Sequence, residues 1–265
     1  MTNKLRLISA TALLCAAASA HAQVDRLMES VKPGNASGIS LSVVRESILR
    51  ESATVFGARE GLRFQSCLIH VEIERKRADL DQKFRFGDLM MGKGVLPPVI
   101  SEARDSVALE DTVMRVASRV YRIDEGARII DVPPTWRDWL LVGLTADDCA
   151  VAIKDAPSQD QLRPQNSQEE AFFRSVLERS YNMGRQQARD VLASNLARLE
   201  RTYFGMRRYF DLFARGMVSA PVIAASTDIL VRDDPNTLIV GNTVIRITIP
   251  VDFVEKSDKW KPLGN

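Results

Sequence analysis

Cys67 and His70 are the two residues whose types and spacing come closest to a catalytic pair. They lie three positions apart in SCLIHVEIERK, a segment with a helical pattern, so one helix face would carry both side chains. A thiol beside an imidazole can become an activated nucleophile when a third group orients the imidazole. The sequence indicates no such third group. We therefore expect the pair to contribute to packing, and we assign no catalytic residues.

Adjacent acidic residues occur at Asp147–Asp148, Glu169–Glu170 and Asp233–Asp234. Two facing carboxyl groups are the machinery of glycoside hydrolysis, so a periplasmic hydrolase acting on peptidoglycan is an alternative function. Such an enzyme needs a cleft in which two carboxylates converge. Each acidic pair falls in a polar loop or at the end of an element, and Glu169–Glu170 is explained by the favourable position of negative charge at a helix start.

Metal and cofactor sites are not expected either. The chain has two histidines and three cysteines, whereas a metal site needs His, Cys and carboxylate ligands clustered together. The stretch MGKGV lacks the residue spacing and the Ser or Thr that a phosphate-binding loop requires. We predict no metal, no cofactor and no nucleotide site.

The segment DVPPTWRDWL, residues 131–140, contains two of the three tryptophans beside a Pro-Pro corner. Thr135 is suited to cap a short helix that begins at Trp136, which places Trp136 and Trp139 on one face. Either both rings fill a local core or they anchor a partner, because tryptophan is enriched at binding hot spots. We expect a split, with Trp136 packed inward and Trp139 reaching a partner. The candidate interaction residues are Pro133, Pro134, Trp136, Arg137, Asp138 and Trp139, with Pro97 and Pro98 of a second Pro-Pro corner.

The elements that would position these residues begin with a helical pattern from Ile39, capped by Ser40 or Ser42. The pattern contains Gly57 and Gly61. Small residues at this spacing allow another backbone to approach closely. Glycine in a helix interior also costs ~1 kcal/mol, so the helix could instead end at Gly61. Both interpretations stay open.

A longer pattern runs from Phe173 to Phe213, where apolar residues recur with a mean step of about 3.6, the period of an α-helix. An unbroken helix would span roughly 65 Å. Gly205 is the expected position of a bend, and Gly216 the expected end. We expect the opposite face to be solvated; its arginines are Arg185, Arg189, Arg198, Arg201 and Arg208.

Two segments show the alternation typical of strands. Residues 120–131 predict a hairpin of two short strands around Asp124–Gly126. Residues 222–253 predict a C-terminal antiparallel hairpin, whose second strand is half-buried and reaches an edge or bulge at Pro250. An edge of β-branched residues is also a docking template for another chain. The predicted fold class is α+β, mostly helical, with one very long or bent amphipathic helix and antiparallel β-hairpins that include a C-terminal one.

Residues 1–22 have the basic start, the apolar run and the Ala-x-Ala end of a secretory signal peptide. We expect cleavage between Ala22 and Gln23. Residues 23–38 predict a flexible leader, because small and polar residues dominate them. Residues 39–265 predict a single α+β domain.

Charge and cysteine content bound the mature chain further. Two of the 36 basic residues lie in the expected signal peptide, which leaves a mature chain balanced against its 34 acidic residues. Bulk charge therefore favours neither nucleic acid nor an anionic membrane surface. The sequence leaves two covalent questions open: whether Cys15, which follows Leu14, is lipidated, and whether Cys67 pairs with Cys149.

Six short blocks follow one another along the chain: VLPPVI at 95–100, PPTWRDWL at 133–140, GRQQA at 184–188, NLARLERTYFGM at 195–206, GMVSAPVIA at 216–224 and IRIT at 245–248. In this order they resemble the DotC family, the outer-membrane lipoproteins of type IVB (Dot/Icm-type) secretion systems, with relatives in IncI-type conjugation systems. The resemblance runs from about Gly57 to Trp260. The chain departs from the family at Cys15, where no lipobox is evident, and at Tyr181, near which relatives tend to carry tryptophan.

The resemblance implies a structural subunit of a secretion core complex, without enzymatic activity. Its implied partners are a DotD-like lipoprotein and DotH-like secretin-type subunits, which it helps to place at the outer membrane. The expected location is the periplasm, in association with the outer membrane, after export by a cleaved signal peptide. The resemblance implies neither direct nucleic-acid binding nor a small-molecule substrate.

Overall fold

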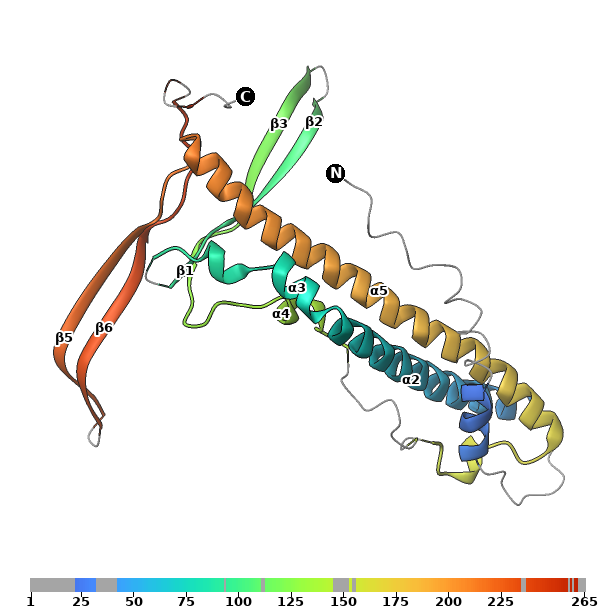
Figure 1. Cartoon of the computed structure of the whole chain (residues 1–265). Coiled ribbons are helices and arrows are strands. Elements are labelled where there is room, and N and C mark those ends of the chain that lie inside the picture. Colours follow the sequence, from blue (N-terminus) through green and yellow to red (C-terminus); the bar gives the residue numbers. More distant parts are fainter. Residues whose placement is uncertain are drawn as a thin grey trace. The chain divides into compact units, whose positions relative to one another are not determined.

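The computed structural model describes residues 22–31, 42–92, 94–110, 113–144, 153, 156–234, 237–256, 258 and 260–261. This described part consists of helices and three two-stranded antiparallel sheets, which confirms the α+β class with one long helix and a C-terminal hairpin (Figure 1). Contacts divide the chain into unit 1, residues 1–76 with 143–193, and unit 2, residues 77–142 with 194–265. The sequence predicts one domain over 39–265, whereas helix α5, Ser167–Ala214, contributes residues to two units.

Helix α2, Val43–Arg75, belongs to unit 1. Ser42, one of the two predicted caps, begins it, because its Oγ accepts a hydrogen bond from the backbone N–H of Arg45 at 3.2 Å. The helix continues through Gly57 and Gly61 without interruption. The interpretation in which Gly61 ends the helix is therefore wrong. Ile39 and Ser40 lie outside the described residues.

Gly57, Gly61 and Gly184 are the positions at which α2 and α5 make backbone contact. A Cβ atom on Gly61 would lie 2.0 Å from the carbonyl oxygen of Tyr181, and one on Gly184 would lie 2.0 Å from the carbonyl oxygen of Ala58. Real Cβ atoms essentially never approach another heavy atom closer than 3.0 Å. The close-approach interpretation is confirmed, and dispersion contacts between the two backbones offset the low helix propensity of glycine.

Residues 22–30 form a helix, which corrects the flexible leader expected over 23–38. Val24, Leu27, Met28 and Val31 are all buried. Their spacing of i, i+3, i+4 and i+7 is the amphipathic pattern of a helix, and burial of this face outweighs the small and polar residues around it. Ala22 and Gln23 lie in its first turn, and residues 1–21 and 32–38 lie outside the described residues. The core of unit 1 also includes Leu49, Ala53, Phe56, Phe173, Val176, Leu177 and Tyr181.

Helix α5 runs for 48 residues without interruption. Gly205, the expected position of a bend, lies inside the continuous helix. A Cβ atom there would lie 2.5 Å from Cγ1 of Val99, so this glycine admits a neighbouring strand. The helix ends as predicted, with Gly216 at a φ of +72°. The Gly216 N–H donates to the carbonyl of Phe213 (2.9 Å), and the Met217 N–H donates to the carbonyl five residues earlier (3.0 Å), which completes a Schellman motif.

Two arginines of the face expected to be solvated are in fact engaged. Arg185 is buried, and its Nε donates to Oε1 of Gln65 at 3.2 Å. Arg208 is half-buried, and its Nη1 donates to the carbonyl oxygen of Ile100 at 2.7 Å. The single apolar stripe did not reveal this, because polar groups of distant segments cover a second side of the helix. Exposed as predicted are Arg189, Arg198 and Arg201.

In unit 2, β1 (Val95–Leu96) pairs with β4 (Arg128–Ile129), and β2 (Val99–Glu110) pairs with β3 (Val113–Glu125), both in antiparallel fashion. The hairpin predicted within 120–131 is therefore wrong, because its two strands belong to different sheets. Alternation identifies strands but not their partners. The extended, buried Pro97–Pro98 step joins β1 to β2, and so lets β4 and β3 pair with them in turn. The short helices of this unit are α3 (Arg77–Lys83), η1 (Phe86–Leu89) and α4 (Arg137–Leu140).

The C-terminal hairpin forms as predicted from β5 (Val222–Asp234) and β6 (Thr237–Ile249). It is less buried than expected, since Val222, Ile245 and Ile249 are 47%, 37% and 57% exposed. Burial resumes only after Pro250, at Val251. A two-stranded sheet alone cannot cover its own apolar face, so these side chains stay exposed within the described residues. The core beside the hairpin includes Ile100, Tyr209, Leu212, Val218 and Val251.

Tyr181 carries a polar atom that the core of unit 1 does not use. Its side chain is fully buried, and its hydroxyl has no hydrogen-bond partner among the described residues. Burial raises its pKa to about 12. An unpaired buried hydroxyl destabilises the folded state, whereas the ring packs against Phe64 at a centroid distance of 6.4 Å.

We expect Tyr181→Phe to raise the free energy of unfolding by about 1 kcal/mol at pH 7, because only the unpaired hydroxyl is lost. In the wild type the raised pKa gives a stabilisation that is present below pH 10 and lost towards pH 12. The variant should lack this alkaline component. Urea unfolding at pH 7 and at pH 11 measures both effects. Tyr209→Phe is the control, because its hydroxyl donates to the carbonyl of Ser219; a variant at 181 no more stable than this control contradicts the prediction.

Candidate interaction site

Trp136, in the segment 131–140 singled out by the sequence, lies in the interior of unit 2. It is 1% exposed, and its Nε1–H donates to Oδ1 of Asp81 at 2.6 Å. The guanidinium of Arg137 lies 4.0 Å from the centre of its ring. Arg137 also approaches Asp81, at 3.9 Å. The inward orientation expected for Trp136 is confirmed. A buried indole N–H needs a hydrogen-bond acceptor, and Asp81 supplies it.

Trp139 lies at the margin of the same core. Its side chain is half-buried, and its ring stacks on Phe86 at a centroid distance of 4.7 Å and an interplanar angle of 7°. Phe86 meets Tyr203 of α5 edge to face at 5.2 Å, and Phe84 meets Tyr203 at 5.3 Å. The two tryptophans thus differ in burial: one is enclosed, and the other presents part of its ring at the surface of an aromatic cluster. That Trp139 reaches a partner stays a prediction.

Polar contacts fix the short helix that carries both tryptophans. The helix begins at Arg137, one residue later than predicted. At its start the carboxylate of Asp138 accepts from the backbone N–H of Thr135 at 2.6 Å and from its hydroxyl at 3.2 Å. At its end the buried Asn195 donates to the carbonyl oxygens of Leu140 (3.1 Å) and Val142 (2.7 Å). Both ends therefore have partners for their otherwise unpaired backbone groups.

The remaining predicted interaction residues divide between surface and interior. Pro133 and Asp138 are exposed and Pro134 is half-buried, whereas Pro97 and Pro98 are buried between β1 and β2. The structure thus leaves most of residues 133–139 exposed or half-buried around the enclosed Trp136, but gives the second Pro-Pro corner an internal place. Sequence reasoning missed Asp81, Phe86 and Asn195, which hold the corner from segments distant along the chain. No local pattern marked them.

Cys67 and His70, the residues that come closest to a catalytic pair, each have a partner in the structure. Cys67 is disulfide-bonded, so its sulfur is not a free thiol nucleophile in this state. The Nε2 of His70 lies 3.3 Å from the carbonyl oxygen of Leu144, within hydrogen-bonding distance. Cys149 lies outside the described residues.

The acidic pairs that a hydrolase would use do not form a described cleft either. Asp147–Asp148 lies outside the described residues, and the side chains of Asp233–Asp234 do as well. Glu169 is 0% exposed and is bound to Arg45. Glu170, beside it, is exposed.

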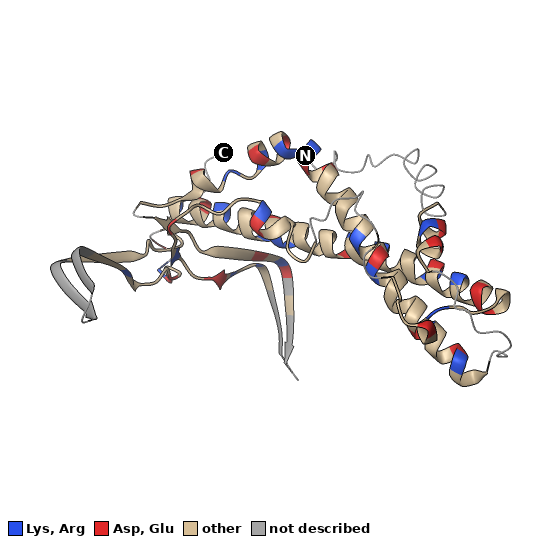
Figure 2. Cartoon of the chain, turned by 90° about the horizontal axis from the view of Figure 1, so that it is seen from below, with Lys and Arg blue, Asp and Glu red and all other residues tan. Residues whose placement is uncertain are grey.

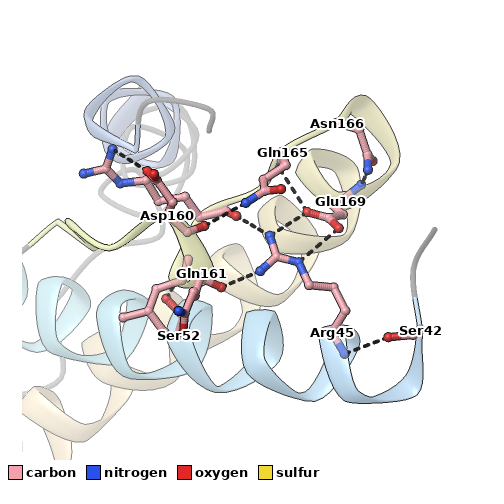
Figure 3. Close-up of polar contacts among 10 residues, drawn as sticks. Ser42, Arg45, Ser52, Asp160, Gln161, Gln165, Asn166 and Glu169 are labelled. Carbon is pink, nitrogen blue, oxygen red and sulfur yellow. Dashed lines mark hydrogen bonds and ion pairs between the residues drawn. The ribbon is translucent and has the colours of Figure 1, made fainter. Parts of the chain in front are cut away.

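Arg45 and Glu169 form the most enclosed ion pair of unit 1 that the described residues show, and Figure 3 presents it. The guanidinium donates to both carboxylate oxygens, Nε at 3.1 Å and Nη2 at 2.8 Å. It also donates to the backbone carbonyls of Gln161 (2.5 Å) and Arg163 (2.6 Å). One arginine thus joins the start of α2, the start of α5 and the loop that contains η2, Asp160–Leu162.

The environment of Glu169 favours its ionised form. The hydrogen bonds from Arg45 lower its pKa below the ordinary value, and they outweigh the opposing effect of burial. The backbone N–H of Gln165 also donates to Oε2 at 2.9 Å. Asn166 accepts from the Glu169 N–H at 2.9 Å. The position of Glu169 at a helix start was predicted, but its partner was not.

Electrostatics elsewhere are mixed. Basic and acidic residues are interspersed along the helices (Figure 2). Within the described ranges, no helix is long and apolar enough to cross a membrane. The same part of the chain contains no group of three or more His, Cys, Asp and Glu side chains that could hold a metal ion.

Comparison with known proteins gives one finding. Residues 43–262, from the first residue of α2 to beyond β6, match the TraI family model described as "Type IV secretory system, conjugal DNA-protein transfer". No curated protein matches the chain. The match confirms the expectation of a type IV secretion or conjugation component, and it covers most of the chain, including the Trp136–Trp139 corner and both long hairpins. The chain therefore belongs to this family of type IV secretory system proteins of conjugal DNA–protein transfer.

Proposed function

We propose that this protein is a non-catalytic structural subunit of the outer-membrane core complex of a type IVB secretion or conjugation system, with the role of the DotC family. It is exported, cleaved after Ala22, and held in the periplasm in association with the outer membrane. There it works with a DotD-like lipoprotein to place a DotH-like subunit. The family match supports the type IV system, and the six sequence blocks support the finer assignment.

The observation that carries this proposal is the pair of long, open hairpins in unit 2. β2–β3 and β5–β6 are each two-stranded sheets, so the outer edges of all four strands lack a strand partner within the described residues. Strands of 12 to 13 residues span roughly 40 Å. Monomeric proteins protect such edges, whereas a subunit of an assembly can pair them with a neighbouring chain.

Exposed aliphatic side chains on the hairpins also support pairing with a neighbouring chain. Val107 of β2 and Val120 of β3 are 54% and 42% exposed, and Ile249 of β6 is 57% exposed. Burial of such residues against a partner is favourable by about 25 cal/mol per Å² of apolar surface. The half-buried ring of Trp139 adds an aromatic anchor, the residue type most enriched at binding hot spots.

The test is affinity purification of the tagged full chain from donor-cell envelopes, with co-purifying subunits identified by mass. Trp139→Ala should fold and accumulate, yet co-purify with much less of the DotH-like or DotD-like subunits, as expected for a hot spot of ~2 kcal/mol or more. Trp136→Phe keeps the inward ring but removes the bond to Asp81. It should lower stability by about 1–3 kcal/mol and leave the assembly intact.

Trp260→Ala is the matched control, because this third tryptophan is 41% exposed and lies outside the corner. It should behave as the wild type in the same purification. If Trp139→Ala retains all partners, residues 133–139 are not part of the interface. Purification of the wild-type chain without any type IVB subunit would overturn the proposed function itself.

A further inference from the structure

A pocket rich in arginine lies between α5 and one face of the β2–β3 hairpin, entirely within unit 2. Its volume is about 420 Å³. The register pairs Glu102 with Tyr121 and Arg104 with Arg119, so these four side chains share one face of the hairpin. Residues of the last turns of α5 form the opposite wall. The geometry is thus set by a strand pair and a helix, which are rigid elements.

The charge of the pocket is strongly unbalanced. Its acidic members are Glu102 and Asp211, and its arginines are Arg104, Arg119, Arg207, Arg208 and Arg215. Five positive charges against two negative ones leave a formal excess of three in a concave space. Such a concentration of one sign raises the local potential and attracts anions.

Glu102 shows how this pocket holds a carboxylate. Its side chain is 12% exposed and lies 3.5 Å from a guanidinium nitrogen of Arg104, 3.8 Å from that of Arg119 and 3.5 Å from that of Arg208. The Tyr121 hydroxyl also lies within hydrogen-bonding distance of it, at 3.4 Å. One internal carboxylate therefore occupies three of the arginines.

Arg207 and Arg215 are the two arginines of the pocket that Glu102 does not contact. Neither guanidinium has an ion-pair or hydrogen-bond partner within the described residues. Arg207 is exposed, and Arg215 is half-buried. They stand eight residues apart, Arg207 in the last turns of α5 and Arg215 directly after its last residue, Ala214. Planar guanidinium groups bind carboxylates with paired hydrogen bonds.

The neighbouring strand edge indicates the source of such carboxylates. The outer edges of β2 and β3 have no strand partner within the described residues. An open strand edge binds an extended peptide through main-chain hydrogen bonds, which a lipid headgroup cannot supply. Phe204, 40% exposed, and Leu212 add an apolar wall beside the charges.

We infer that this arginine pocket docks an acidic segment of a partner protein. The backbone of that segment extends along an outer edge of the β2–β3 hairpin, and its carboxylates bind Arg207 and Arg215. The inference rests on the proposed function in that the partner is a protein. It names the chemistry of that partner: an extended segment with glutamate or aspartate at alternate positions and apolar residues between them.

The test is calorimetric titration of the full chain with a ten-residue peptide of alternating glutamate and valine, at low salt and pH 7. Arg207→Gln/Arg215→Gln should weaken binding about tenfold or more. Arg198→Gln/Arg201→Gln is the matched control, with the same charge change at exposed positions of the same helix outside the pocket. It should change affinity less than about twofold. Melting curves should show all variants folded, because none of these four side chains has an ion-pair or hydrogen-bond partner among the residues that the structure describes.

Three further arms use a glutamine–valine peptide, inorganic phosphate, and phosphatidylcholine vesicles with one-fifth phosphatidylglycerol. The proposal requires weak binding of all three. Equal binding of the glutamine peptide, or equal affinity of the double variant, overturns it. Binding of phosphate or vesicles that depends on the two arginines, without peptide binding, assigns the pocket to a phosphate group instead. If peptide binding fails but the Trp139-dependent assembly is intact, only the inference about the pocket is overturned. If the wild-type chain purifies without any type IVB subunit, the proposed function is overturned.

Discussion

Gly61→Val and Gly184→Val should each destabilise unit 1 by more than about 4 kcal/mol, the largest effect expected for any single substitution in this chain. The first atom of either side chain would lie 2.0 Å from a carbonyl oxygen of the facing helix. That oxygen belongs to rigid helical backbone, so α2 and α5 must move apart and lose their mutual packing. Helix propensity works in the opposite direction, because valine is a better helix former than glycine.

The measurement is thermal unfolding followed by circular dichroism, where a loss of this size corresponds to a drop of about 10 °C or more for a chain of this length. Gly126→Val is the control, because a Cβ atom there meets nothing within 4 Å. It should change stability by no more than about 0.5 kcal/mol. A Gly61→Val variant that melts with the wild type would show that the two backbones are not in contact.

Arg45→Met should lower the free energy of unfolding by about 3–5 kcal/mol at pH 7, because it leaves the fully buried carboxylate of Glu169 without its cation. The same change also removes the donors to two loop carbonyls. Arg45→Met/Glu169→Leu should recover most of the loss, since an apolar pair replaces both charges. Chemical denaturation of the four members of this double-mutant cycle gives the coupling directly.

The pH dependence of this loss has a definite sign. The folded-state pKa of Glu169 is lowered from 4.5, so its stabilising effect is present above pH 4.5 and is lost as pH falls through the folded value. In Arg45→Met the buried carboxyl can take up a proton, so the gap to the wild type should narrow below pH 4.5. A gap that is constant down to pH 3 would contradict the ion-pair explanation.

Lys76→Met is the matched control for the ion pair. Lys76 and Glu72 also form a close pair, but their side chains are 57% and 52% exposed. Solvent screens such a pair, and its loss should change stability by less than about 1 kcal/mol. Comparable losses from Lys76→Met and Arg45→Met would mean that burial does not determine the strength of these pairs.

The tryptophan corner shows how far a candidate site could be predicted. The spacing of Trp136 and Trp139 gave a shared helix face, and the expected inward place of Trp136 is confirmed. Asp81, which accepts the Trp136 N–H, lies 55 residues earlier in the chain. Asn195, which caps the end of the same helix, lies 55 residues later than Leu140. A pattern within ten residues contains no information about either partner.

The sequence by itself determined the features that depend on neighbours within a turn or two. These are a serine cap at position 40 or 42, the helix end at Gly216, the continuous period of α5 and the alternation of the C-terminal hairpin. Each arises because backbone geometry repeats every 3.6 or 2 residues, and because caps satisfy groups only three to five positions away. The same local rule, applied to Val24, Leu27, Met28 and Val31, would have replaced the expected leader by the helix that forms.

Only the tertiary structure decided which distant segments meet. Gly61 fits either a helix end or a close contact until Gly184 is opposite it. Residues 120–131 fit a hairpin until β3 and β4 find different partners across the Pro97–Pro98 step. Arg208 fits a solvated face until Ile100 presents its carbonyl. The physical reason is that the burial of a backbone, a strand edge or a charge is stabilised only by a complementary group, and chain order does not specify which group lies opposite in space.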